Sequence, residues 1–216
     1  MKKLLYLLIF IISFLVFFVW TFPADKIVIY YLNKYDIQYE SVEGNLFKLK
    51  IENLEYKQLL IPELLIKTSF LKINILIPEN NKIVIDINRN IFLNLKDLEL
   101  ENLQKKPILF GNAKGNAKVS IKKYILADGN IDILIKKYQP YNIRNMKVHL
   151  KMKKSNEKTK LNIKINSPNI NGVFIGYAKI PIRNVYEGII EGDFEGKIFG
   201  SVSSQHIRIK VGNLIK

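Results

Sequence analysis

The chain has 216 residues, no cysteine and a formal net charge of +15. Without cysteine there is no disulfide, no thiol catalysis and no zinc–thiolate site, but the compartment stays open because many exported domains lack disulfides. The lysines alternate with Ile and Leu along the whole chain, as in proteins of AT-rich genomes, so we attribute part of the charge to composition and expect the rest to favour an anionic membrane surface or an acidic partner.

An apolar segment follows two lysines at the start of the chain. The 19 residues from Leu4 to Phe22 contain no charged side chain, which is enough helix to cross a hydrocarbon core of about 30 Å. Pro23 ends this helix because it lacks a backbone N–H and restricts the residue before it. The sequence therefore predicts a transmembrane anchor in residues 1–23, with boundaries at Leu4 and Phe22 and a helix stop at Pro23.

The competing interpretation of this segment is a cleaved signal peptide. Such a peptide has a shorter apolar stretch, of about 7–15 residues, and a cleavage site of small residues. Residues 21–25, Thr-Phe-Pro-Ala-Asp, contain no such site, so we favour the uncleaved anchor. The initial lysines favour a cytoplasmic N-terminus. We thus expect a single-pass protein of the cell inner membrane with its C-terminal domain in the periplasm.

The rest of the chain divides into a short helical segment and a long β-rich domain. Residues 24–35 are expected to form a juxtamembrane helical segment. From residue 36 to 216 the apolar period becomes two, which is typical of strands with one buried and one wet face. The alternating segments are 46–52, 82–88, 93–96, 117–122, 131–133, 147–153, 161–166 and 207–211.

Turn-forming residues lie between these segments, at 80–81, 111–112, 128–130, 167–169 and 171–172. No segment of helical period separates the strands, which argues against βαβ units. The sequence therefore predicts an all-β protein: a single N-terminal transmembrane helix followed by an elongated, mostly antiparallel β-sheet domain outside the cytoplasm.

Few residues are candidates for chemistry. His149 and His206 alternate with basic residues on polar strand faces, so surface histidines are favoured over metal ligands or general bases. The segment 111–115 lacks the Lys-Ser/Thr and the following helix of a phosphate-binding loop, and we interpret it as a turn. Ser201, Ser203 and Ser204 are expected in a loop without the context of a nucleophile.

A basic and aromatic cluster is the nearest approach to a nucleic-acid platform. It consists of Lys136, Lys137 and Tyr138 with Tyr141 and Arg144, and a membrane-tethered domain outside the cytoplasm makes that ligand a poor match. We therefore predict that the protein is not an enzyme and has no catalytic residue, cofactor, metal or nucleic-acid partner.

The expected anchor ends in Phe22-Pro23-Ala24-Asp25, and residues 42–54 read Val-Glu-Gly-Asn-Leu-Phe-Lys-Leu-Lys-Ile-Glu-Asn-Leu. Through this exit and this motif, the region from Phe22 to about Leu103 resembles the family of type II secretion system protein N. In this resemblance the strand-pair motif is carried by Gly44, Leu46, Leu49, Ile51 and Leu54. AsmA-like inner-membrane proteins are similar in the same way, and the strand Asn171–Ala178 resembles both groups. Neither family implies catalytic residues.

Two functions follow from the layout and the resemblance, and a membrane-tethered scaffold in an unrelated system is a third possibility. The first is a non-enzymatic structural or assembly component of a type II secretion system, bound to other envelope or secretion-complex proteins. The alternative is a protein that handles lipid or lipopolysaccharide, as AsmA-like proteins or the single-anchor export protein C of lipopolysaccharide transport do. The alternative requires that the apolar face of the sheet is an open groove, without a second layer over it.

Overall fold

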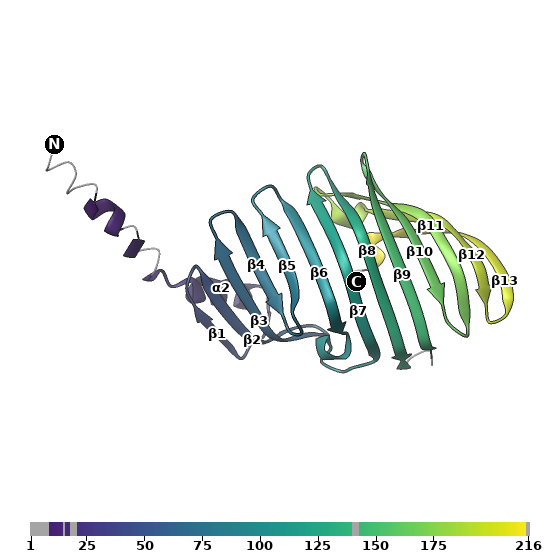
Figure 1. The fold of residues 1–216 in the computed structure, drawn as a ribbon, viewed down its shortest axis with the longest axis horizontal. Helices are drawn as coiled ribbons and strands as arrows, with labels where there is room; N and C mark the ends of the chain where they lie inside the picture. The colour runs from purple at the N-terminus through teal and green to yellow at the C-terminus, as the bar shows by residue number, and fades with distance from the viewer. Residues whose placement is uncertain (1–8, 15, 18–20, 140–142, 215–216) are drawn as a thin grey trace.

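The computed structural model describes residues 9–14, 16–17, 21–139 and 143–214, and its main element is one antiparallel sheet of 13 strands (Figure 1). Each strand pairs with the next in the chain, so the sheet is a continuous meander, which confirms the prediction of an all-β, mostly antiparallel fold. The strands are β1 (Ser41–Gly44), β2 (Lys48–Tyr56), β3 (Leu59–Ser69), β4 (Lys72–Ile77), β5 (Asn81–Asp86), β6 (Asn90–Glu99), β7 (Leu109–Ile121), β8 (Tyr124–Tyr138), β9 (Ile143–Ser155), β10 (Lys158–Asn166), β11 (Ile170–Pro181), β12 (Ile189–Ile198) and β13 (Ser201–Lys210).

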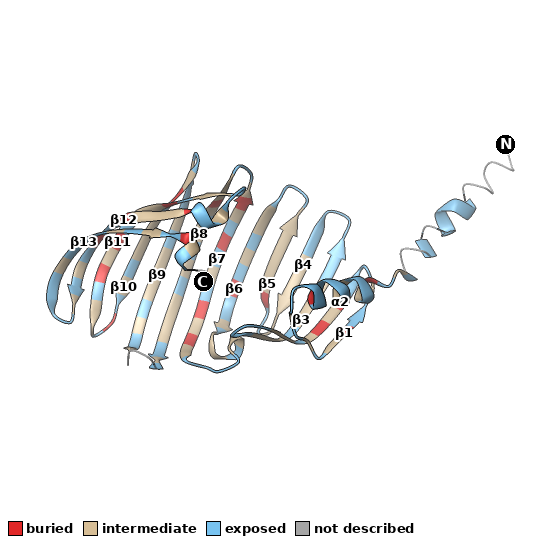
Figure 2. Ribbon diagram, turned by 180° about the vertical axis from the view of Figure 1, so that it is seen from behind, coloured by how far each residue is buried: buried red, intermediate tan, exposed pale blue. Residues whose placement is uncertain are grey.

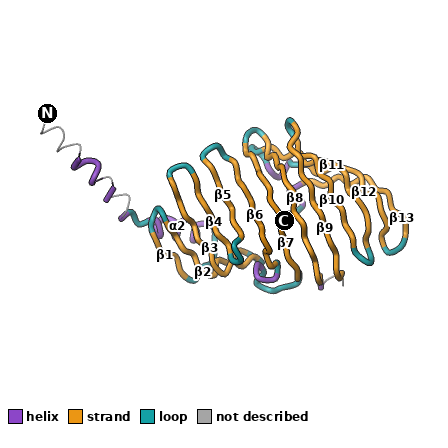
Figure 3. Tube along the Cα trace, in the orientation of Figure 1, coloured by secondary structure: helices purple, strands orange, loops and turns teal. Residues whose placement is uncertain are grey.

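Loops join the strands; α2 precedes β1 at one end of the sheet, and η1 lies in the connection between β6 and β7 (Figure 3). The helical elements are α2 (Ala24–Lys34) and the short 3₁₀ segments η1 (Glu101–Leu103), η3 (Val185–Glu187) and η4 (Val211–Asn213). The strands follow from the alternation of Ile, Leu and Val with Lys and Asn, because this alternation gives a strand one apolar and one polar face.

Several expected turns and one expected loop are instead parts of strands. Residues 111–112, 128–130 and 171–172 lie within β7, β8 and β11, and Ser201, Ser203 and Ser204 lie in β13. The glycines are in strands because neighbouring backbones approach them closely. A Cβ on Gly129 would lie 2.2 Å from the carbonyl oxygen of Asn116 on the adjacent strand. Residues 167–169 do connect two strands, β10 and β11.

The helix α2 covers one end of the sheet. It carries Asp25 in its first turn and Lys34 in its last, which complements the helix dipole. Its Leu32 is buried with Val42 of β1 and with Leu49 and Ile51 of β2, and these four side chains form the core cluster of the molecule. We call the face of the sheet that α2 covers the inner face, and the opposite one the outer face (Figure 2).

The other end of the sheet curls back on its inner face. The end of β11 pairs with the start of β8, through Ile180 opposite Ile125 and Pro181 opposite Tyr124. Because β8, β9, β10 and β11 also pair in sequence, these four strands close into a ring at this end. The backbone N–H of Ala127 donates to Oγ1 of Thr159 at 2.8 Å within this closure. Figures 1 and 2 show β11–β13 turned back on the same side as α2.

The N-terminal segment before α2 contains helical residues at 9–14, 16–17 and 21, and Phe22 and Pro23 lie between these and α2. Within the described residues no helix has the length and apolarity needed to cross a membrane, so the structure does not support the predicted transmembrane helix. The predicted boundary Leu4, and residues 5–8, 15 and 18–20 of the expected anchor, lie outside the described residues.

Candidate ligand-binding face

The inner face is aliphatic across the first half of the sheet. Side chains that are directly opposite in the strand register point to the same face, and the register of β3–β6 aligns Ile and Leu in cross-strand rows. The members of these rows are Leu64 and Ile66 on β3, Ile73 and Ile75 on β4, Ile83 and Ile85 on β5, and Ile91 and Leu93 on β6. All are half-buried except Ile73, which is 39% exposed.

The inner face continues as an aliphatic surface over β8–β10. Two rows cross three strands each: Ile131, Leu150 and Ile163 form one, and Ile133, Val148 and Ile165 form the other. Met152 and Leu161 extend the surface toward the ring. All of these side chains are half-buried. An aliphatic face of this extent, left partly open to solvent, is typical of a surface that binds an apolar partner.

The two halves are joined by β7, which gives the inner face small residues. Ala113, Gly115 and Ala117 lie opposite Ile133, Ile131 and Gly129 of β8. The inner face is therefore apolar from β1 to the C-terminal strands, and its side chains are shortest along β7.

Both ends of the inner face are closed by packing. At the start of the sheet α2 covers it through Leu32. At the far end Phe174 of β11 and Phe194 of β12 are 7% and 6% exposed, and Ala178 is also buried. Between these ends no described residue forms a second layer over β3–β6, whereas β11–β13 turn back on the inner side at the far end (Figure 2). The open part of the face is the arrangement that the lipid alternative requires.

The residues of the predicted strand-pair motif have different surroundings. Gly44 ends β1 opposite Leu49, at φ +132°, and a Cβ there would lie 2.1 Å from the carbonyl oxygen of Lys48. Leu49 and Ile51 are in the core cluster, and Leu54 packs against it. Leu46 lies in the connection between β1 and β2 and is 37% exposed, so the structure does not bring it into the cluster.

The outer face is polar, and several of its charges contact or lie opposite a residue of unlike charge. Lys50 contacts Glu52 at 2.5 Å and Glu63 at 3.5 Å. These contacts hold the pKa of Lys50 above its usual value, mainly through the hydrogen bond to Glu52. Directly opposite pairs of unlike charge recur along the sheet. They are Lys72 with Asp86, Lys114 with Asp132, Lys118 with Asp128, and Arg208 with Glu191.

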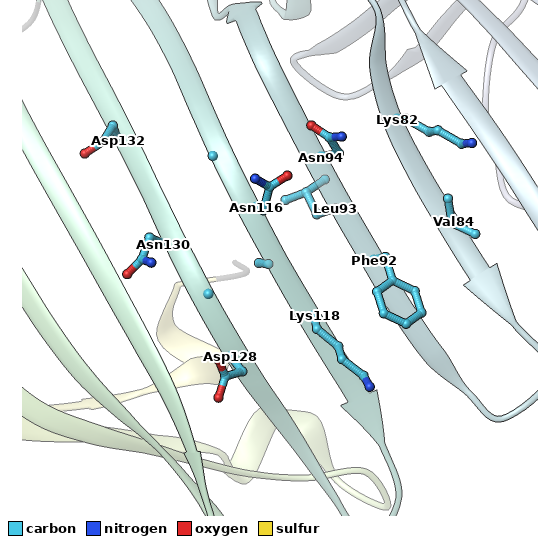
Figure 4. Close-up of a pocket in the computed structure, with 13 residues that line it drawn as sticks. Lys82, Val84, Phe92, Leu93, Asn94, Asn116, Lys118, Asp128, Asn130 and Asp132 are labelled. Carbon is cyan, nitrogen blue, oxygen red and sulfur yellow. The ribbon is translucent and has the colours of Figure 1, made fainter.

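A hollow of about 650 Å³ lies on the outer face over β5–β8 (Figure 4). A row of short amide side chains, Asn94, Asn116 and Asn130, crosses it on three adjacent strands. Its carboxylates, Asp128 and Asp132, lie opposite lysines, so their charges are offset. The hollow is a polar surface whose carboxylates lie opposite lysines, and we do not assign it as the site.

The two histidines lie on the outer face, where each contacts an aspartate directly across the strands. His149 Nδ1 is 2.5 Å from Oδ1 of Asp132, and His206 Nδ1 is 2.8 Å from Oδ1 of Asp193. The hydrogen bond to Asp193 is the main cause that raises the pKa of His206. The sequence places both histidines on polar faces, but it does not reveal these contacts, because they depend on the register. Across the described residues no group of three or more His, Cys, Asp or Glu could hold a metal ion.

No family model, no curated protein and no solved structure matches this chain. The assignment of the inner face as the candidate site therefore rests on its geometry and on the chemistry of its side chains.

Proposed function

We propose that this protein holds the acyl chains of a membrane lipid against the inner face of its sheet. The single observation that carries the proposal is the aliphatic surface of β3–β6, which continues onto β8–β10. Among the described residues no second layer covers β3–β6 between α2 and the C-terminal strands that turn back. In water such a surface is unfavourable by about 25 cal/mol for each Å² of apolar area that stays exposed. Acyl chains would remove that surface from water without any hydrogen-bonding requirement.

The shape and chemistry of the face support a lipid over a polar ligand. The rows that cross β8–β10 consist only of Ile, Leu and Val, which offer no donor or acceptor to a polar group. A face that follows the sheet across many strands, each about 4.8 Å from the next, is long enough for an extended chain. The packed ends at α2 and at Phe174 set limits to the bound segment.

We further propose that residues 4–22 anchor the protein in a membrane, with the sheet outside the cytoplasm. The uncharged run of 19 residues supports this placement. Helical residues in this segment have large apolar side chains facing outward, with Phe10 67% and Phe17 64% exposed. A sheet that α2 joins to such an anchor would stand next to the source of its lipid. The role in a type II secretion system remains a prediction from the resemblance.

Photo-cross-linking in cells tests the lipid proposal. Benzoyl-phenylalanine is placed at Ile83 or Ile131 on the inner face, and in matched variants at Lys82 or Asn130, the preceding residues on the outer face. After irradiation, mass spectrometry of the purified full chain is expected to find lipid adducts at the two inner positions and none at the two outer ones.

Circular dichroism of each variant shows whether the sheet has formed. Lipid adducts that are absent from both inner positions of folded variants, or equal on both faces, would overturn the proposal. Protein adducts at the inner positions in place of lipid would instead favour an assembly role for this face.

A further inference from the structure

The outer face has a strip of lysines without acidic partners, on β9 and β10. The lysine strip consists of Lys147, Lys151, Lys153, Lys160 and Lys164, all of them exposed. Neither β9, with the sequence IRNMKVHLKMKKS, nor β10, with KTKLNIKIN, contains an Asp or Glu. Among the described residues, no ion pair includes any of the five lysines.

The register shows how the strip differs from the rest of the outer face. Lys153 lies directly opposite Lys160. Lys151 lies between Asn130 and Asn162, and Lys164 lies opposite His149. Elsewhere Lys72, Lys114 and Lys118 each face an aspartate. Composition alone predicts lysines throughout, but it does not predict that β9, β10 and β11 are three consecutive strands without an Asp or Glu, so that β10 has no acidic residue on either neighbouring strand.

An unpaired strip of this kind costs stability. Like charges directly opposite in a sheet are destabilising, and Lys153 with Lys160 is such a pair. A second pair, Lys48 with Lys67, lies on strands that also carry the Lys50–Glu52–Glu63 cluster. Among the described residues neither Lys153 nor Lys160 is in an ion pair, so an anionic partner would complement this pair.

The width of the lysine strip and the spacing of its lysines favour an extended peptide as the anionic partner. The strip is two strands wide, about 5 Å between strands, and the lysines along each strand are spaced by multiples of about 6.6 Å, which is the spacing of alternate residues in an extended peptide. Acidic residues lie on both sides, Asp128 and Asp132 on β8 and Glu191, Asp193 and Glu195 on β12. A broad anionic plane, such as a membrane surface, would meet these carboxylates, whereas a single extended chain would not.

A neighbouring apolar residue adds to the fit. On β11, next to the strip, Ile175 is 62% exposed on the outer face and lies opposite Asn162. Lys158 lies over the ring of Tyr177, with its Nζ 4.2 Å from the ring centre.

We propose that the lysine strip docks an acidic, extended segment of a partner protein along β9 and β10, on the face opposite the lipid surface.

Peptide binding tests this interaction. The probe is a fluorescein-labelled peptide of alternating Glu and Ser, titrated with the full chain in a neutral detergent at low salt. The strip variant carries Lys151→Gln, Lys153→Gln, Lys160→Gln and Lys164→Gln. The control variant carries Lys50→Gln, Lys72→Gln, Lys114→Gln and Lys118→Gln, which removes the same charge from lysines of the same face that contact or lie opposite an acidic residue.

The strip variant is expected to bind the peptide at least tenfold more weakly than the original chain, while the control variant stays within about threefold. Equal weakening in both would show a net-charge effect and overturn the proposal, as would no binding by the original chain. Binding to vesicles of phosphatidylglycerol without binding to the peptide would assign the strip to a membrane surface instead. Circular dichroism establishes that both variants are folded.

Discussion

Phe174 and Phe194 lie directly opposite each other on β11 and β12, and each ring covers glycines instead of side chains. A Cβ on Gly192 would lie 2.8 Å from Cζ of Phe174, and one on Gly172 would lie 2.5 Å from Cζ of Phe194. The two rings close the C-terminal end of the inner face because the glycines leave them room to lie flat. Large residues and glycines are thus complementary parts of one packed layer.

Gly192→Ala is therefore expected to destabilise the protein. Its Cβ would also lie 2.4 Å from both Cα of Gly176 and the carbonyl oxygen of Ile175, so two strands must separate, at a cost of about 1–3 kcal/mol. Urea unfolding of the full chain measures the change. Glu195→Ala, on the exposed outer face of the same strand, serves as the control and should alter the free energy of unfolding by less than about 0.5 kcal/mol. Equal stability of both variants would contradict this packing.

The alternation of the sequence predicted the sheet and its two faces because period two depends only on local geometry. His149 and Lys151 could be assigned to one polar face from spacing alone. The same reasoning misplaced glycine-bearing segments such as 111–112 and 128–130, since glycine favours turns and also permits close strand approach. Only the strand register shows whether a glycine lies in a turn or within a strand.

The closure of the sheet could not be predicted from local patterns. The pairing of Ile125 with Ile180 joins strands that are far apart in the chain, and it depends on curvature accumulated over β8–β11. The sequence predicted an apolar face, whereas the absence of a second layer over β3–β6 among the described residues depends on the course of the whole sheet. The Asp193–His206 contact and the unpaired lysine strip likewise became visible only with the register.

Lys160→Glu is expected to stabilise the protein. The substitution replaces the like-charge pair with Lys153 by an opposite-charge pair, and cross-strand pairs of this type contribute about 0.2–1 kcal/mol. Lys118→Glu is the mirror experiment, because it places a second carboxylate opposite Asp128 and should destabilise by a similar amount. Both effects should shrink when salt is raised to about 1 M, where charges are screened within about 3 Å. A loss of stability in Lys160→Glu would mean that the strip is not repulsive.

Asn81→Ala is expected to cost about 1–3 kcal/mol, because it leaves buried backbone groups without partners. Asn81 is fully buried, its Nδ2 donates to the carbonyl oxygen of Pro78 at 2.7 Å, and its Oδ1 accepts from the backbone N–H of Lys96 at 3.0 Å. These bonds fasten the turn before β5 to β6. Thermal unfolding of this variant is compared with that of Asn88→Ala, an exposed position, which should lie within about 0.5 kcal/mol of the original chain.

The contact between His206 and Asp193 predicts a defined pH dependence. The carboxylate raises the pKa of His206 above the usual 6.5 by accepting a hydrogen bond from the charged ring. A group whose pKa is raised by folding stabilises the folded state fully below its unfolded pKa, and this contribution is lost as the pH rises through the raised value. NMR titration of the ring should therefore give a pKa above 6.5 that falls in Asp193→Asn. Asp132→Asn, which removes the carboxylate beside the other histidine, should leave the pKa of His206 unchanged.

A pKa of His206 that is equal in the original chain and in Asp193→Asn would show that the ring does not depend on the Asp193 carboxylate. Glu191, whose Oε1 lies 3.6 Å from Nε2 of His206, would then be the next group to test.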